Sequence, residues 1–207
     1  MFTPGDLPPL PLPEGIRSRY LDTEPWGLQY HILESIPPTT QPTELVLFIH
    51  GFPELAYSWR YALPKIASAG YHAVAVDQRG HGRTTSSTPS ALAAESFRPI
   101  NLSQDFILLV HALGYTRVKC IVGHDTGSLT AAAERGNPRL KSCTFIVGDR
   151  DPAPVQDVNG ARPMEDGTSV AEGKYRGTVV IPGAGHWLSQ EAPEETADAI
   201  LNFLKEI

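Results

Sequence analysis

The sequence has 207 residues, of which 41% are hydrophobic and 19% charged. This composition supplies enough apolar material for a buried core and excludes disorder as the main state. Lys and Arg number 17 against 23 Asp and Glu, a net charge of −6 that argues against nucleic acid as a partner, because phosphate binders need a basic face.

The chain start is rich in proline, with five prolines in residues 1–15. We expect an extended N-terminal arm there, followed by a single domain over 16–207. No basic start precedes an apolar stretch, and no apolar run reaches a membrane span, so we expect neither a signal peptide nor a membrane helix. Cys120 and Cys143 lie in apolar runs, which favours free thiols and a cytoplasmic location over a disulfide scaffold.

Residues 18–33 alternate in polarity and predict two strands joined by a turn at 24–27. Apolar runs without alternation then predict strands buried on both faces of a parallel sheet. These runs occupy 45–50, 72–77, 118–123, 143–148 and 177–183. Helices are expected between and after them, at 57–69, 101–113, 127–135 and 193–206, and a polar loop at 156–174. Alternation of strands and helices predicts an α/β architecture.

Chemically suggestive residues follow four of these runs, at the strand ends where α/β sheets carry their sites. GHDTG (123–127) has the form of a nucleophile elbow with Asp125 at its tip, although G-x-D-x-G taken alone is also typical of a plain turn. GDRDP (148–152) and PGAGH (182–186) supply an acid and a histidine in the chain order of the hydrolase elbow. HGFP (50–53) offers a backbone N–H near a developing oxyanion.

Five segments together resemble the α/β-hydrolase epoxide hydrolases and the related dehalogenases. The segments are HGFPELAYSWR (50–60), DQRGHGRTT (77–85), GHDTGS (123–128), GDRDP (148–152) and PGAGHWLSQEAPEE (182–195). The resemblance implies an α/β-hydrolase fold, with a mostly parallel sheet flanked by helices.

By this resemblance Asp125 is the nucleophile, His186 the base that activates water, and Asp151 the acid that orients the imidazole. The backbone N–H groups of Phe52 and Thr126 would form the oxyanion hole. A carboxylate nucleophile suits displacement at a strained sp3 carbon and leaves an alkyl ester for water to hydrolyse. We therefore expect an epoxide hydrolase-like enzyme that acts on a small apolar electrophile and water, with no cofactor and no metal.

Some assignments stay open. Asp149 competes with Asp151 for the acid role, and the G-x-x-D spacing favours Asp151. A structural role in bracing a turn is expected for Asp77, Arg79 and His81. A solvated helix start is expected for Glu191, Glu194 and Glu195.

The chain departs from the family in one respect. Asp125 and Asp151 are 26 positions apart (151 minus 125), which leaves no room for the family's helical lid and one core strand. The acid would then follow the strand next to the elbow strand. Loss of the lid tyrosines would weaken activation of the leaving oxygen. An apolar patch around Phe52, Pro53 and Trp187 would be uncovered, which favours a homodimer.

Two alternative functions remain. The missing lid and strand suggest a non-catalytic or weakly active shortened protein on a hydrolase scaffold. A dehalogenase is the other alternative, disfavoured because Thr126 stands where haloalkane dehalogenases place a tryptophan.

Overall fold

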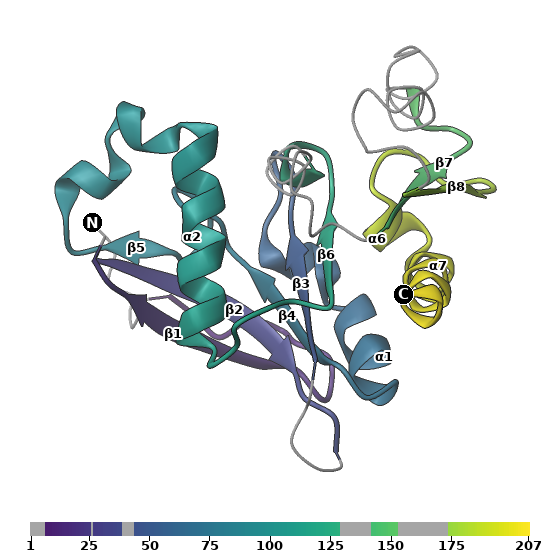
Figure 1. The fold of residues 1–207 in the computed structure, drawn as a ribbon, viewed down its shortest axis with the longest axis horizontal. Helices are drawn as coiled ribbons and strands as arrows, with labels where there is room; N and C mark the ends of the chain where they lie inside the picture. The colour runs from purple at the N-terminus through teal and green to yellow at the C-terminus, as the bar shows by residue number, and fades with distance from the viewer. Residues whose placement is uncertain (1–6, 26, 39–43, 129–141, 153–173) are drawn as a thin grey trace. The chain divides into compact units, whose positions relative to one another are not determined.

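The computed structural model describes residues 7–25, 27–38, 44–128, 142–152 and 174–207. The chain forms two compact units, Met1–Ala133 and Glu134–Ile207, whose positions relative to one another are not determined (Figure 1). The single domain expected over 16–207 stays a prediction. Residues 8–13 of the N-terminal arm have neither helix nor strand.

The first unit is built on one sheet. Its strands are β1 (Arg17–Thr23), β2 (Leu28–Ser35), β3 (Leu45–Ile49), β4 (His72–Val76), β5 (Thr85–Ser86) and β6 (Cys120–Gly123). The strand order is β1-β2-β4-β3-β6, with β5 beside β2. β2 is antiparallel to β1, β4 and β5, whereas β3 is parallel to β4 and β6. The parallel strands β3, β4 and β6 therefore end at the same edge of the sheet, where the expected site segments 50–53 and 123–127 lie.

Helices cover both faces of this sheet. These are the α-helices α1 (Ala62–Ser68) and α2 (Pro99–Ala112) and the 3-10 helices η2 (Ala56–Trp59), η3 (Pro89–Leu92) and η4 (Ala94–Phe97). Phe106 and Leu109 of α2 pack with Leu47 and Val76 in the larger core cluster. Phe48, whose side chain points to the other face because neighbours along a strand alternate, packs on Trp59 of η2. The uninterrupted apolar runs are thus explained by burial on two sides.

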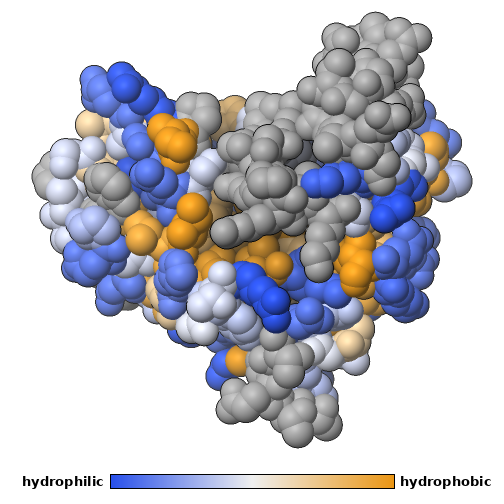
Figure 2. Space-filling view, in the orientation of Figure 1, coloured by the Kyte–Doolittle hydropathy of each residue, from blue (hydrophilic) through white to orange (hydrophobic). Residues whose placement is uncertain are grey.

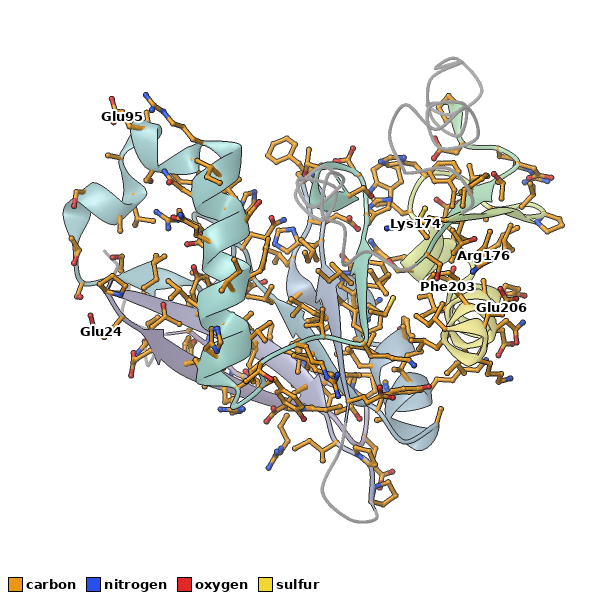
Figure 3. All side chains as sticks on the ribbon, in the orientation of Figure 1. Glu24, Glu95, Lys174, Arg176, Phe203 and Glu206 are labelled. Atoms are coloured by element: carbon orange, nitrogen blue, oxygen red, sulfur yellow. The ribbon has the colours of Figure 1, made fainter. Side chains whose placement is uncertain are left out.

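The second unit holds two parallel strands, β7 (Cys143–Gly148) and β8 (Tyr175–Ile181), and the helices α6 (Leu188–Glu191) and α7 (Pro193–Glu206). Its core cluster contains Ile181, Ala184 and Leu188. Figure 3 labels Lys174 and Arg176 near the start of β8 and Phe203 and Glu206 near the end of α7.

The structure confirms the expected strands and refines the helices. The helix expected at 57–69 is divided into η2 and α1, and Pro64 lies in the first turn of α1, where a missing N–H is tolerated. Residues 126–128 are helical, and the rest of the helix expected at 127–135 lies outside the described residues. The loop expected at 156–174 also lies outside them, apart from Lys174.

Over the described ranges, no helix has the length and apolar character needed to cross a membrane. Both cysteines are free thiols, and both are half-buried rather than fully buried.

The DQRG segment after β4 has the expected structural role. Asp77 is buried and accepts hydrogen bonds from the Ala56 N–H at 2.8 Å and from His31 Nδ1 at 2.7 Å. Arg79 is also buried and pairs with both carboxylate oxygens of Asp105, at 2.8 Å and 2.5 Å. These bonds tie β4 to β2, η2 and α2, so the segment braces the scaffold.

A buried carboxylate joins three strands at the other end of the sheet. Glu34 is fully buried and accepts hydrogen bonds from Arg17, Arg19 and His72, at distances between 2.7 and 3.1 Å. Burial alone would raise the pKa of Glu34, but the hydrogen bonds and charges of His72 and Arg19 lower it to about 2. This carboxylate is therefore a stabilising anion whose effect depends on pH.

Candidate active site

The elbow after β6 has a strained tip. Asp125 has a φ of 48°, the one positive φ that a non-glycine residue adopts in the described part of the chain. A side chain in this left-handed region costs about 1–2 kcal/mol. A nucleophile elbow places its central residue in such a strained conformation, so the geometry of Asp125 agrees with the expected elbow.

Glycines let the elbow pack tightly. A Cβ at Gly123 would lie 2.6 Å from the Gly127 carbonyl oxygen, and a Cβ at Gly127 would lie 2.5 Å from the His50 carbonyl oxygen. Both clashes are with backbone, which cannot move aside as a side chain can. The turn is closed by hydrogen bonds from the Gly127 N–H to His124 O and from the Ser128 N–H to Asp125 O, at 2.8 and 2.9 Å.

The loop after β3 contacts the Asp125 carboxylate. The Phe52 N–H donates to Asp125 Oδ2 at 3.0 Å, so one of the two expected oxyanion donors lies against the expected nucleophile. His50 fixes this loop: its Nε2 accepts the Gln78 N–H at 3.0 Å, and its Nδ1–H therefore donates to Gly51 O at 2.7 Å. Burial lowers the pKa of His50, which keeps the ring neutral for this arrangement. Thr126 begins the helical segment and is exposed; its role as the second donor stays a prediction.

A buried ion pair that the sequence did not reveal supports the elbow. Glu54 accepts hydrogen bonds from His124 Nδ1 at 2.5 Å and from the Gly51 N–H at 3.2 Å. Burial alone would raise the pKa of Glu54, but the hydrogen bond and charge of His124 lower it to about 2. The pair joins the loop after β3, which carries Glu54, to the elbow after β6, which carries His124 and Asp125. The two members of the pair are 70 residues apart in the sequence.

The acid and the histidine meet in the second unit. His186 Nδ1 and Asp151 Oδ2 are 3.0 Å apart, and since a carboxylate only accepts, Nδ1 carries the proton of this hydrogen bond. Asp149 instead accepts the Gly183 N–H at 2.7 Å and so braces the histidine loop. The geometry therefore favours Asp151 over Asp149 as the partner of His186.

The expectation that Glu191 belongs to a solvated helix start is wrong. Its side chain is exposed, yet Oε2 accepts the Gly185 N–H at 2.8 Å and Oε1 accepts the Trp187 N–H at 3.1 Å. Glu191 thus folds back from α6 onto the backbone N–H groups of Gly185 and Trp187, the two chain neighbours of His186. Its place five positions after the histidine was visible in the sequence, but a carboxylate at that spacing has no signature of its own.

The expected site residues therefore form two groups. Asp125 and Phe52 lie together in the first unit, and Asp151 and His186 lie together in the second. Their meeting across the two units stays a prediction.

The expected apolar patch has exposed members in both units, with Phe52 66% exposed and Trp187 44% exposed. Orange, apolar residues reach the surface in several places on the face shown in Figure 2. The expected homodimer through this patch stays a prediction. Over the described ranges, no group of three or more His, Cys, Asp or Glu side chains could hold a metal ion.

Comparisons with known proteins show what the chain is similar to. Epoxide hydrolase A of Mycobacterium tuberculosis (strain ATCC 25618 / H37Rv) is 40% identical over 111 residues, which cover 54% of this chain and 31% of that protein. An epoxide hydrolase of Caballeronia sordidicola is 42% identical over 165 residues, covering 72% of this chain and 48% of that protein. The chain thus spans less than half the length of these two relatives.

The fold is shared with a crystal structure of an epoxide hydrolase from Vigna radiata, at a TM-score of 0.75 and 20% identity over 94% of this chain and 99% of that one. A family model described as alpha/beta hydrolase fold matches residues 44–166, more than half of the chain. This match shows that the chain belongs to the alpha/beta hydrolase fold family.

Proposed function

We propose that this chain is an epoxide hydrolase that opens small apolar epoxides to diols through an ester of Asp125. The observation that carries the proposal is the strained Asp125, with its carboxylate against the Phe52 N–H in an elbow where esterases carry serine. The similarity to epoxide hydrolases over 72% of the chain supports the same substrate class.

The first half-reaction forms the ester. A carboxylate oxygen of Asp125 attacks a ring carbon of the epoxide, the carbon–oxygen bond of the ring breaks, and its electron pair moves to the ring oxygen. That oxygen takes a proton from water and becomes the first hydroxyl of the diol. Aryl epoxides suit this step because the aromatic ring stabilises the positive charge that develops at the carbon under attack. This stabilisation reduces the need for a lid tyrosine.

The second half-reaction needs His186 to reach the ester. Nε2 takes a proton from water, and the hydroxide attacks the ester carbonyl carbon. The Phe52 N–H, which already contacts Oδ2 of Asp125, would stabilise the oxyanion, with Thr126 as the second donor. Asp151 stabilises the imidazolium that forms, because its carboxylate lies against Nδ1. When the intermediate collapses, the bond between the ester carbon and the alkoxide breaks, and the alkoxide takes the proton from Nε2 and leaves as the diol. The carboxylic acid formed at Asp125 gives its proton to the hydroxide left by the first half-reaction, which regenerates the carboxylate.

The test is diol formation from an aryl epoxide by the wild type and by Asp125→Asn, a variant of nearly the same size and shape. Diol from the wild type at a rate well above the variant and the uncatalysed reaction supports the proposal. Equal rates would overturn it and favour the non-catalytic alternative. Halide release from an alkyl halide without diol formation would instead favour a dehalogenase.

A further inference from the structure

Glu191 makes two contacts that bracket the candidate base. Its two carboxylate oxygens accept the N–H groups of Gly185 and Trp187, the residues immediately before and after His186, at 2.8 and 3.1 Å. Hydrogen bonds to an ionised acceptor are about twice as strong as neutral ones. The backbone N–H groups of the residues before and after His186 are therefore both held by one carboxylate.

We call the two contacts of the Glu191 carboxylate the clamp. Glu191 lies at the end of α6, a helix that packing and hydrogen bonds hold in place. Leu188, at the start of α6, is buried in the core cluster with Ile181 and Ala184, and its carbonyl oxygen accepts the Thr196 hydroxyl at 3.0 Å. The Glu191 N–H donates to Trp187 O at 2.9 Å, so the helix turn and the side chain hold the same segment. Position 191 is thus fixed by packing, and the loop is fixed to it.

Gly185 fits the clamp by having no side chain. A Cβ there would lie 3.0 and 3.1 Å from the two carboxylate oxygens of Glu191, closer than such contacts normally come. The loop is held on its other side by Asp149, which accepts the Gly183 N–H at 2.7 Å, and by the Arg150 N–H, which donates to Ala184 O at 3.0 Å. Asp149 and Arg150 thus hold the residues that precede His186, and Glu191 holds the residues on either side of it.

We propose that Glu191 is a positioning residue for His186, and that it acts on the hydrolysis of the ester rather than on its formation. The inference rests on the proposed function. In that mechanism Asp125 attacks without a base, whereas water attacks only when Nε2 of His186 lies at the correct point. A shift of about 1 Å in a catalytic group costs about 100-fold in rate. Loosening the loop therefore slows the step that uses the imidazole.

This selectivity gives a kinetic signature. If only ester hydrolysis slows, the alkyl-enzyme accumulates, so kcat and KM fall together and kcat/KM, which reports ester formation, stays the same. In Glu191→Gln one carboxylate oxygen becomes an amide that cannot accept an N–H. We expect kcat to fall about 10- to 100-fold with kcat/KM within about twofold of the wild type. Glu191→Asp keeps the charge but is shorter, and we expect an intermediate effect.

The matched control is Glu195→Gln, the same change at an exposed position on the first turn of α7. It should leave kcat and KM unchanged. Intact-mass measurement during turnover should show the ester adduct in Glu191→Gln and little of it in the control. Equal losses in kcat and kcat/KM without an adduct, or unchanged kinetics in both Glu191 variants, would overturn the inference.

A second readout does not depend on turnover. Amide hydrogen exchange of the peptide spanning residues 183–188 should be faster in Glu191→Gln than in the wild type and unchanged in Glu195→Gln. Unchanged exchange in Glu191→Gln would show that the clamp does not hold the loop. A wild type that makes no diol would overturn the proposed function and the kinetic role with it, while the exchange result still decides whether Glu191 holds the histidine loop.

Discussion

The left-handed conformation of Asp125 predicts an unusual order of stability for two substitutions. Asp125→Ala and Asp125→Gly both remove the carboxylate and its hydrogen bond from the Phe52 N–H, so they differ only in the Cβ. At a φ of 48° that Cβ costs about 1–2 kcal/mol. The greater entropy of glycine in the unfolded chain offsets about 0.5–1 kcal/mol of this. We expect Asp125→Gly to be more stable than Asp125→Ala by about 1 kcal/mol.

The matched control is an ordinary helical position in the same unit. Gln104 is exposed in the middle of α2, where alanine should be more stable than glycine by about 1 kcal/mol. Urea denaturation followed by circular dichroism gives the free energy of unfolding of all four variants. The two pairs should therefore differ in opposite directions. If alanine is the more stable residue at both positions, position 125 is not strained and the elbow geometry is wrong.

Three further predictions concern the scaffold and the acid. Gly127→Ala should lower the free energy of unfolding by about 2 kcal/mol or more, measured by urea denaturation, because its Cβ would meet the His50 carbonyl oxygen at 2.5 Å; a neutral substitution would contradict this packing. The pKa of Glu34 is about 2 in the folded protein, below its value of 4.5 in the unfolded chain, so ionised Glu34 stabilises the folded state above pH 4.5. As the pH falls toward 2, the protein should lose about 3 kcal/mol of this stabilisation. Stability curves of the wild type and Glu34→Gln should thus converge at low pH, and parallel curves would refute the assignment. Asp151→Asn should lower kcat for diol formation about 1000-fold, whereas Asp149→Asn, which keeps an acceptor for its backbone partner, should stay within about twofold; the reverse order would exchange their roles.

The strands were predictable because their burial dominates the sequence. LVLFI and HAVAV are fully buried on both faces, and such runs need no tertiary information to be recognised. The elements that were not expected are short: β5 has two residues, η3, η4 and α6 four each. Segments of this length have too few residues to show a periodicity, and tertiary contacts decide their conformation.

The site was predictable where backbone geometry restricts residue choice. Gly123 and Gly127 indicate the elbow in the sequence because a side chain at either position would clash with backbone atoms. The carboxylates were harder, since Asp149, Glu54 and Glu191 act through contacts that exist only after the loops fold together. Charge and spacing alone cannot tell a carboxylate that binds a backbone N–H from one that is solvated.

Turnover of an aryl epoxide in water enriched in oxygen-18 tests the ester of Asp125 most directly. Hydroxide adds to the ester carbonyl, so the account places the heavy oxygen in the Asp125 carboxylate and returns a protein oxygen to the diol. After several turnovers and proteolysis, mass spectrometry should find the peptide containing Asp125 heavier by 2 Da for each oxygen exchanged. Heavy oxygen in the diol from the first turnover, with none in that peptide, would mean that water attacks the epoxide directly and that Asp125 is not the nucleophile.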